Sequence, residues 1–386
     1  MRIHTRKDNV VYLFLWIEMK IGIVGLPNVG KSTLFNALTK SYSAPAENFP
    51  FCTIEPNVGI VNVKDKRLEA LSVMSHTQKI VYAAIEFVDI AGLVKGASQG
   101  EGLGNKFLSH IRETDAIVQV LRYFKESDVV HVEWTVDPMR DVEIINTELI
   151  LSDLDQIDRN LPAIQKRAKI TSNKEDGKLV HVLEQVQTVL REGKIVHSLK
   201  EYLSAEEWKL LKPYNFLTMK PFVYAINISQ DDIPEAHHIQ EEFMVKLQSP
   251  VAIVCAKLES EMMEFEDEEK QDFMKELLSL DKISHIPTLD DLIALAYNKV
   301  GLMYYFTTWE KESRAWAIPI GSTAPQAAGA IHTDFERWFI KAEVVRCEDL
   351  LTYGSWAKAK EKWLVKLEGK DYIVRDWDVM IFKFNV

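Results

Sequence analysis

The chain has 386 residues, which is enough for two or three domains that each bury an apolar core. Its net charge of −11 argues against a protein that coats nucleic acid, and we expect no DNA binding, although a local basic groove is compatible with that charge. The three cysteines lie far apart without metal-ligand spacing, which excludes a disulfide framework and fits a reducing, cytoplasmic compartment. They are Cys52, Cys255 and Cys347.

The first eighteen residues combine a basic start with a short apolar run at 10–17. This pattern imitates a signal peptide, but no small-residue cleavage site follows it. The run is too short to span a bilayer, and no later stretch looks transmembrane, so we expect no membrane association. We interpret Met19 as the native start and residues 1–18 as an N-terminal extension that is not native.

Apolar runs alternate with helix-compatible stretches in the first part of the chain and again before residue 301. Strands are expected at 20–24, 81–88, 116–121, 221–226 and 250–255, with a helix at 31–40. Apolar runs of this length, with helices between them, indicate a mostly parallel sheet covered by helices on both faces. We therefore predict an α/β domain built from 19–137 and 213–301.

Between 138 and 212 the apolar spacing becomes helical. Two long helical stretches with a polar break at 171–177 predict an antiparallel, coiled-coil-like helical hairpin inserted into the α/β domain. Two interpretations of its basic tip stay open, a solvated surface or a contact with ribosomal RNA phosphates. The tip residues are Lys166, Arg167, Lys169, Lys174 and Lys178.

From about residue 302 the pattern becomes strand-like again. Strands are expected at 315–320, 339–345, 372–374 and 379–384, with a helix near 332–339. This pattern predicts a separate, small, β-rich α+β domain at 302–386.

A phosphate-binding pattern, G-x-x-x-x-G-K-[ST], is met by Gly25, Gly30, Lys31 and Ser32. An expected strand precedes it and a helix follows, so successive backbone N–H groups can form an anion cradle. Lys31 would reach the β- and γ-phosphates, and the Ser32 hydroxyl would ligate Mg²⁺. The sequence therefore predicts a P-loop nucleoside-triphosphate hydrolase.

Two further elements would complete a triphosphate site. Asp89 ends an apolar strand, where its carboxylate can orient a Mg²⁺-bound water, and Gly92 can offer its N–H to the γ-phosphate. Thr53 lies between the first helix and the second strand, where a switch loop places a threonine on Mg²⁺ and the γ-phosphate.

The residue after Gly92 is Leu93, where many GTPases of the Ras type carry a glutamine that orients the attacking water. An apolar side chain cannot hold that water. Asn28 is a candidate ligand for a monovalent cation that would supply positive charge between phosphates, and we hypothesise K⁺-dependent hydrolysis.

The base-reading element departs from guanine specificity. Guanine-specific enzymes usually carry N-K-x-D after the matching strand, whereas this chain has Asn227, Ile228 and Gln230 at the first, second and fourth positions. A neutral amide cannot reproduce the charged, bidentate acceptance of guanine donors, so we expect ATP to be preferred and GTP to bind more weakly. Asn227 and the Ile228 backbone can hold adenine. The segment that would close over the base contains Ala256, Lys257 and Leu258.

These motifs resemble the YchF family of Obg-like ATPases. The matching segments run from Met19 to Val386, nearly the whole chain, and are 25–33, 48–57, 87–98, 100–105, 111–114, 144–148, 323–329, 331–335 and 369–374.

The resemblance implies three domains: a G domain, an inserted helical hairpin and a C-terminal TGS domain. It implies preference for ATP over GTP, Mg²⁺ dependence, and association with the ribosome, through the large subunit or the 70S particle; we expect a monomer. It places Mg²⁺ on Ser32 and Thr53 and the base on the Ile228 backbone. The residues that would hold the phosphates are Asn28, Val29, Gly30, Lys31, Ser32 and Thr33.

Three positions depart from the family pattern. Gln230 replaces a Glu, which would blur the base preference. Gln119 replaces a His implicated in hydrolysis, so slow turnover or a water-orienting amide is expected, with Lys31 and Gly92 as the other catalytic candidates. Trp377 replaces a Gly, so that turn would differ or its ring would serve a contact surface.

Three functions therefore compete. The leading hypothesis is an ATPase whose nucleotide state controls ribosome binding. The second is a guanine-using GTPase of the same fold. The third is a nucleotide-gated adaptor with negligible hydrolysis, because Leu93 and Gln119 are poor catalytic residues.

Overall fold

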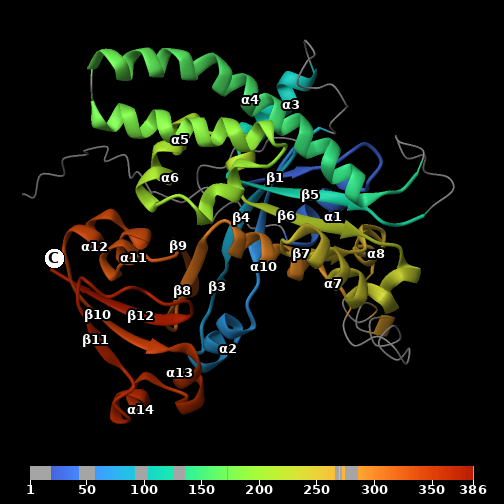
Figure 1. Cartoon of the computed structure of the whole chain (residues 1–386). Coiled ribbons are helices and arrows are strands. Elements are labelled where there is room, and N and C mark those ends of the chain that lie inside the picture. Colours follow the sequence, from blue (N-terminus) through green and yellow to red (C-terminus); the bar gives the residue numbers. More distant parts are fainter. Residues whose placement is uncertain are drawn as a thin grey trace, which may run out of the picture. The chain divides into compact units, whose positions relative to one another are not determined.

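The computed structural model describes residues 19–42, 57–91, 103–125, 135–171, 173–265, 269, 272–273 and 286–385. These residues form two compact units (Figure 1). One comprises Met19–Val63 and Ala84–Val300, and the other joins Lys64–Ala83 to the C-terminal residues from Gly301 onward. The predicted extension at 1–18 and the candidates Thr53, Gly92 and Leu93 lie outside the described residues.

The first unit is built on a six-stranded sheet in the order β2-β4-β1-β5-β6-β7. β1 pairs in parallel with β4 and β5, and the pairs β5–β6 and β6–β7 are parallel too, so the predicted mostly parallel sheet is confirmed. Every residue of β5 and β6 is buried, as expected for central strands covered on both faces. The strands are β1 Lys20–Val24, β2 Val58–Val63, β4 Ala83–Asp89, β5 Ala116–Arg122, β6 Phe222–Asn227 and β7 Val251–Val254.

Helices cover both faces of this sheet. Successive side chains of a strand point to opposite faces, and β5 shows both environments. Gln119 points toward α4, while Val120 approaches Gly25 at the start of the phosphate-binding loop. The helices are α1 Lys31–Ser41, α3 Leu103–Arg112, α4 Pro138–Thr171, α5 Lys174–Arg191, α6 Ala205–Leu211, α7 Ala236–Leu247, α8 Ala256–Met262 and α10 Leu289–Lys299. Short 3-10 helices are η2 Val196–Glu201, η3 Lys212–Tyr214, η4 Leu217–Met219 and η5 Gln230–Glu235.

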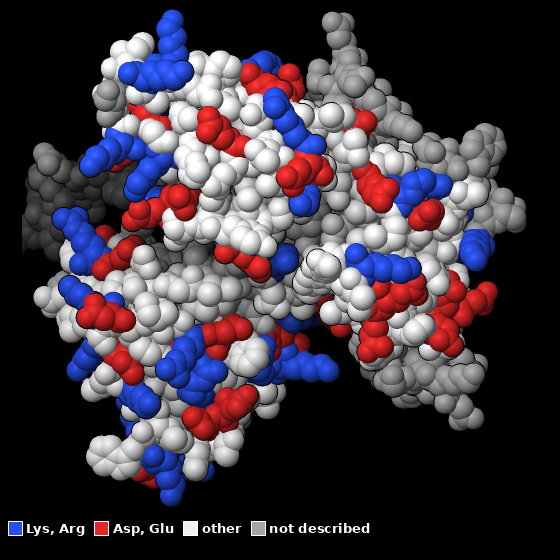
Figure 2. All heavy atoms as spheres, in the orientation of Figure 1, with Lys and Arg blue, Asp and Glu red and all other residues white. Residues whose placement is uncertain are grey.

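The long helices α4 and α5 lie antiparallel where the inserted hairpin was expected (Figure 1). They share an apolar core that includes Ile157, Leu161, Val182 and Val186. The break between them is shorter than the predicted 171–177, because the helix-capping side chain Asn173 accepts a hydrogen bond from the Glu175 N–H and α5 begins at once. Lys and Arg side chains gather at the loop end of this hairpin, with acidic side chains beside them (Figure 2).

The second unit contains a mixed six-stranded sheet in the order β11-β10-β12-β8-β9-β3. Its core includes Tyr305, Ile318, Ala342 and Met380, which are buried between the sheet and α11. The strands are β3 Ile80–Val81, β8 Leu302–Thr308, β9 Ser313–Pro319, β10 Phe339–Arg346, β11 Lys366–Glu368 and β12 Asp378–Phe384. The helices are α2 Lys66–Met74, α11 Ala324–Ile331, α12 Thr333–Arg337, α13 Cys347–Tyr353 and α14 Trp356–Glu361.

The predicted strand at 81–88 is confirmed from Ala83 onward as part of β4, but the chain divides just before it. Ile80 and Val81 form β3 and pair with β9 of the second unit, whereas β4 starts at Ala83 and pairs with β1. Residues 64–83 were predicted within the α/β domain, but they pack with the C-terminal part of the chain. The Asp65 carboxylate, for example, accepts a hydrogen bond from the Tyr304 hydroxyl.

Two smaller expectations in this unit also change. The predicted strand at 372–374 is an isolated bridge between Thr323 and Ile373. Trp377 keeps a glycine-like conformation with φ of 69°, and the Arg67 guanidinium lies 3.7 Å above its ring, so the turn does not need glycine. The described part of the chain contains no helix with the length and the apolar character of a membrane span.

Candidate nucleotide-binding site

The phosphate-binding loop connects the end of β1 to the start of α1. Gly30 precedes the helix with φ of 87°, and its carbonyl accepts the first helical hydrogen bond from the Leu34 N–H at 2.9 Å. A Cβ at Gly25 would lie 2.8 Å from the Val29 side chain and 3.0 Å from the Val120 carbonyl oxygen. Both glycines are therefore required by the space and the backbone conformation of the loop.

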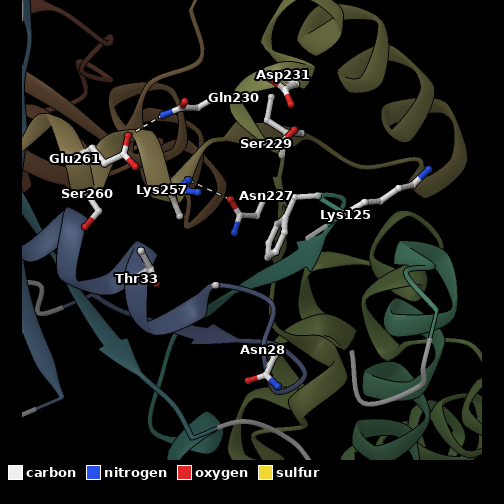
Figure 3. Close-up of a pocket in the computed structure, with 14 residues that line it drawn as sticks. Asn28, Thr33, Lys125, Asn227, Ser229, Gln230, Asp231, Lys257, Ser260 and Glu261 are labelled. Atoms are coloured by element: carbon white, nitrogen blue, oxygen red, sulfur yellow. Dashed lines mark hydrogen bonds between the residues drawn. The ribbon is translucent and has the colours of Figure 1, made fainter. Parts of the chain in front are cut away.

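Asn227 joins the loop to two other elements of the site (Figure 3). Its Nδ2 donates to the Val29 carbonyl at 3.0 Å, and its Oδ1 accepts from the Ala256 N–H at 3.1 Å. The side chain is 3% exposed, and a Cβ at Gly30 would lie 2.2 Å from Nδ2. Asn227 thus fixes the end of β6, the loop and the start of α8 relative to one another.

Arg122 is a second buried side chain that supports the loop, and the sequence analysis did not identify it. Its Nε donates to the Phe124 carbonyl at 3.2 Å, and its Nη1 donates to the Asn28 carbonyl at 3.4 Å. Its guanidinium lies 4.4 Å above the Phe124 ring. An arginine within a run of buried apolar residues, just before Phe124 and Lys125 of the pocket, was the available signal.

Lys31, Ser32 and Asp89 meet at the carboxyl ends of β1 and β4. Parallel pairing places Ile23 opposite Asp89, and the Lys31 ammonium lies 2.5 Å from an Asp89 carboxylate oxygen. The Ser32 hydroxyl donates to the other carboxylate oxygen at 3.3 Å. Both charged side chains are largely buried.

These oxygens fit a hard divalent cation such as Mg²⁺. Within the described part of the chain, no group of three or more His, Cys, Asp or Glu residues can hold a metal. A cation at Ser32 and Asp89 would therefore need further oxygen ligands from water and from phosphates, which is how Mg²⁺ is usually held beside nucleotides.

A pocket of about 630 Å³ opens beside the loop, a volume suited to a small-molecule ligand (Figure 3). It brings together most of the residues expected to contact the nucleotide. Its lining includes Asn28, Gly30, Thr33, Phe124, Lys125, Asn227, Ile228, Ser229, Gln230, Asp231, Ala256, Lys257, Ser260 and Glu261.

Two expected site residues, Leu258 and Gln119, do not line the pocket, and the N–H of a third, Ile228, already has a partner. The Ile228 N–H donates to the Val254 carbonyl at 2.9 Å, so it is engaged in the sheet. Leu258 is 2% exposed and does not line the pocket. Gln119 is completely buried, with Nε2 3.4 Å from the Asp141 carbonyl oxygen, so in this conformation it cannot orient a water at the phosphates.

Gln230 and Glu261 face each other across one end of the pocket (Figure 3). The Gln230 Nε2 donates to a Glu261 carboxylate oxygen at 2.8 Å. Gln230 starts η5 and Glu261 belongs to α8, so this bond connects the two elements that follow β6 and β7.

The helix α8 is also tied to α10. The Glu259 carboxylate accepts a hydrogen bond from the Leu289 N–H at 3.0 Å, at the start of α10. Burial, with the nearby charges of Asp290 and Asp291, raises the pKa of Glu259 to about 7, although the Leu289 N–H opposes this rise.

Two family models match parts of the chain. Residues 20–153 match a family described as 50S ribosome-binding GTPase. Residues 302–385 match the YchF-GTPase_C family, described as a protein of unknown function.

Close relatives match over nearly the whole chain. The chain is 48% identical over 369 residues to the ribosome-binding ATPase YchF of Haemophilus influenzae, covering 95% of this chain and 99% of the relative. It is 47% identical over 375 residues to the ribosome-binding ATPase YchF of Bacillus subtilis, covering 96% and 100%. The solved structure of the Schizosaccharomyces pombe YchF GTPase superposes with a TM-score of 0.82 at 34% identity, covering 95% of this chain and 98% of that one.

Proposed function

The chain belongs to the YchF family, and from that membership we propose that it is a cytoplasmic P-loop switch protein that binds and hydrolyses ATP and associates with ribosomes. The observation that carries this proposal is the pocket beside the phosphate-binding loop, where Gln230 stands in place of a guanine-reading aspartate.

The base environment supports ATP over GTP. A neutral Gln230 cannot offer a carboxylate to the two donors of guanine. The Ile228 N–H is engaged by Val254, so only the Ile228 carbonyl would face a ligand. A carbonyl accepts from the 6-amino group of adenine and cannot accept from the 6-oxo group of guanine.

The phosphates and Mg²⁺ would lie on the loop. Ser32 would hold Mg²⁺ directly and Asp89 through a bound water, with Thr53 as a further expected ligand. The ion would stabilise negative charge on the phosphates. Lys31, which pairs with Asp89 in this structure, would exchange that carboxylate for phosphate oxygens when nucleotide binds.

Slow hydrolysis is part of the proposal. The motif predicts that Gly92 and Leu93 lie beside the γ-phosphate, and the apolar Leu93 cannot hold the attacking water. Gln119 is buried, so it does not orient that water either. Asn28 is exposed in the loop with φ of 63°, and by its place in the phosphate-binding motif it is the candidate ligand for K⁺. Turnover should therefore be faster in K⁺ than in Na⁺ buffer, and equal turnover would remove the potassium site from the proposal.

The hairpin tip is a candidate ribosome contact. Arg167 is paired with Asp176 at 2.8 Å, and all five basic side chains of the tip are exposed. The other four are Lys166, Lys169, Lys174 and Lys178. Exposed lysines attract RNA phosphates, and we place the contact on the large subunit or the 70S particle, made by a monomer.

Single-turnover hydrolysis of ATP, measured with and without 70S ribosomes, tests the switch. Acceleration by ribosomes is expected. No acceleration, with negligible hydrolysis in both samples, would instead support a nucleotide-gated adaptor. A GTPase of the same fold is the other candidate, because one family model and the S. pombe structure carry that description.

A further inference from the structure

Gln230 presents an ambiguous group to a purine base. Its amide carries an acceptor oxygen and a donor nitrogen, and rotation of the amide by half a turn exchanges them. One orientation matches the 6-amino and N1 edge of adenine, and the other matches the N1–H and 6-oxo edge of guanine. A glutamine alone therefore does not choose between the two bases.

Glu261 removes this ambiguity. An ionised carboxylate only accepts hydrogen bonds, so the group of Gln230 that lies 2.8 Å from Glu261 is the Nε2 amide and not the oxygen. The second Nε2 hydrogen and Oε1 are left to meet a ligand. Both residues line the pocket beside the loop.

The backbone on each side of this hydrogen bond is anchored. Ser229 and Asp232 form a capping box at the start of η5, with the Ser229 hydroxyl donating to Asp232 at 2.6 Å. On the other side, α8 is held at Ala256 by Asn227 and at Glu259 by the Leu289 N–H. The backbone that carries each residue is therefore held in place, while both side chains are exposed.

We propose that Glu261 is a positioning residue that sets the base preference of the pocket: by fixing the Gln230 amide in one orientation, it allows the pocket to distinguish the 6-amino edge of a purine from the 6-oxo edge. The inference rests on the proposed function, in which this pocket holds the base of the nucleotide and prefers adenine to guanine.

Calorimetric titration with ADP, GDP and IDP in Mg²⁺ buffer tests it. Inosine carries the 6-oxo and N1–H groups of guanine without its 2-amino group, so it reports the edge that the amide contacts. In Glu261→Gln the neutral side chain accepts or donates, and the ratio of the Kd for GDP to that for ADP should fall about tenfold, the worth of one hydrogen bond. The ratio for IDP should fall with it.

The matched control is Glu264→Gln, which removes the same charge from an exposed residue three positions further that does not line the pocket. It should leave both ratios unchanged. In a Gln230→Leu background, Glu261→Gln should no longer alter the ratio, because the residue acts through the amide.

Three results overturn the inference: an unchanged ratio in Glu261→Gln, an equal fall in Glu264→Gln, or the same fall in the Gln230→Leu background. Retained affinity for ADP shows that each variant is folded. Failure of the wild-type protein to bind ADP, or a wild-type preference for GDP, would instead contradict the proposed function itself.

Discussion

Asn227 is the single side chain that connects three parts of the nucleotide pocket. It is 3% exposed, donates to the loop at Val29 and accepts from α8 at Ala256. Removing it leaves a buried carbonyl and a buried N–H without their partner, which costs about 1–3 kcal/mol for each group left unsatisfied.

We expect Asn227→Ala to lower the melting temperature of the nucleotide-free protein and to weaken ADP binding at least about tenfold, since a distortion of 1.4 kcal/mol in the loop has that effect. Calorimetry and thermal unfolding measure both quantities. Gln230→Ala is the comparison, because it changes the base contact without touching the loop. Equal ADP affinity in Asn227→Ala and wild type would show that the loop does not depend on this side chain.

Sequence reasoning found the residues of the site whose chemistry follows from a motif. The glycines, Lys31, Ser32, Asp89 and Asn227 all lie together in the structure. Sequence reasoning failed where the role of a polar side chain depends on where the fold buries it. Gln119 aligned with a functional position but lies under α4, and Arg122 supports the loop from inside the sheet. Spacing along a strand cannot show which face a polar side chain will meet.

At the scale of single elements, two tryptophans occupy backbone conformations that favour glycine. Trp363 follows α14 with φ of 60° and is 89% exposed, so little packing offsets its strain. Trp377 has φ of 69°, but its ring stacks on the Arg67 guanidinium at 3.7 Å.

We expect opposite effects from the two glycine substitutions. Trp363→Gly should raise the free energy of unfolding by about 1 kcal/mol, because the strain is relieved and almost no contact is lost. Trp377→Gly should lower it by about 1 kcal/mol, because the loss of the ring contact exceeds the relief. Urea unfolding of the two variants provides the comparison, and changes of the same sign would refute the explanation.

The connection between α8 and α10 should depend on pH. The pKa of Glu259 is raised from 4.5 to about 7 by burial and by Asp290 and Asp291, so the fold favours the protonated acid. The contribution of protonated Glu259 to the free energy of unfolding is fully present below about pH 4.5. It is lost as the pH rises through about 7, and this loss is at most about 3 kcal/mol.

A neutral amide at this position keeps an acceptor for the Leu289 N–H and carries no charge at any pH. Glu259→Gln should therefore be more stable than wild type at pH 8, with the difference shrinking toward pH 5. Chemical unfolding at the two pH values measures this. A variant that is destabilised equally at both would show that the carboxylate is not strained by its surroundings.

The elements of the α/β sheet were predictable because apolar runs and glycine-rich turns mark them. The division of the run at 81–88 was not. The apolar pattern continues through Tyr82 without a break, although Val81 pairs with β9 and Ala83 starts β4. Partners at such distant positions in the chain are set by tertiary packing, which local pattern does not report.

At the scale of the whole molecule, the proposed function requires that a change of bound nucleotide alters the surface that contacts the ribosome. Arg112 ends α3, which follows the Asp89–Gly92 element along the chain. It donates to Gln156 and Ser152 of α4 at 2.9 and 3.1 Å. The hairpin helix α4 is thereby hydrogen-bonded to α3, the helix that follows the Asp89–Gly92 element along the chain.

Arg112→Met keeps the aliphatic stem and removes the donors. We expect ADP affinity to stay within about twofold of wild type, while stimulation of ATP hydrolysis by ribosomes falls by about two- to thirtyfold, the usual range of such coupling. Arg159→Met is the control, since Arg159 is exposed on α4 and bonds to Asp155 of the same helix. If both variants keep full stimulation by ribosomes, the Arg112 hydrogen bonds do not couple the nucleotide site to the hairpin.

The central claim is that this pocket binds ATP in preference to GTP, and competition between the two nucleotides in the wild-type protein tests it most directly. Labelled ATP is bound in Mg²⁺ buffer and displaced by unlabelled GTP, and the reverse experiment is run at matched concentrations. The account predicts that ATP displaces GTP at lower concentration than GTP displaces ATP. Stronger displacement of ATP by GTP would contradict it and would identify the chain as a guanine-using enzyme.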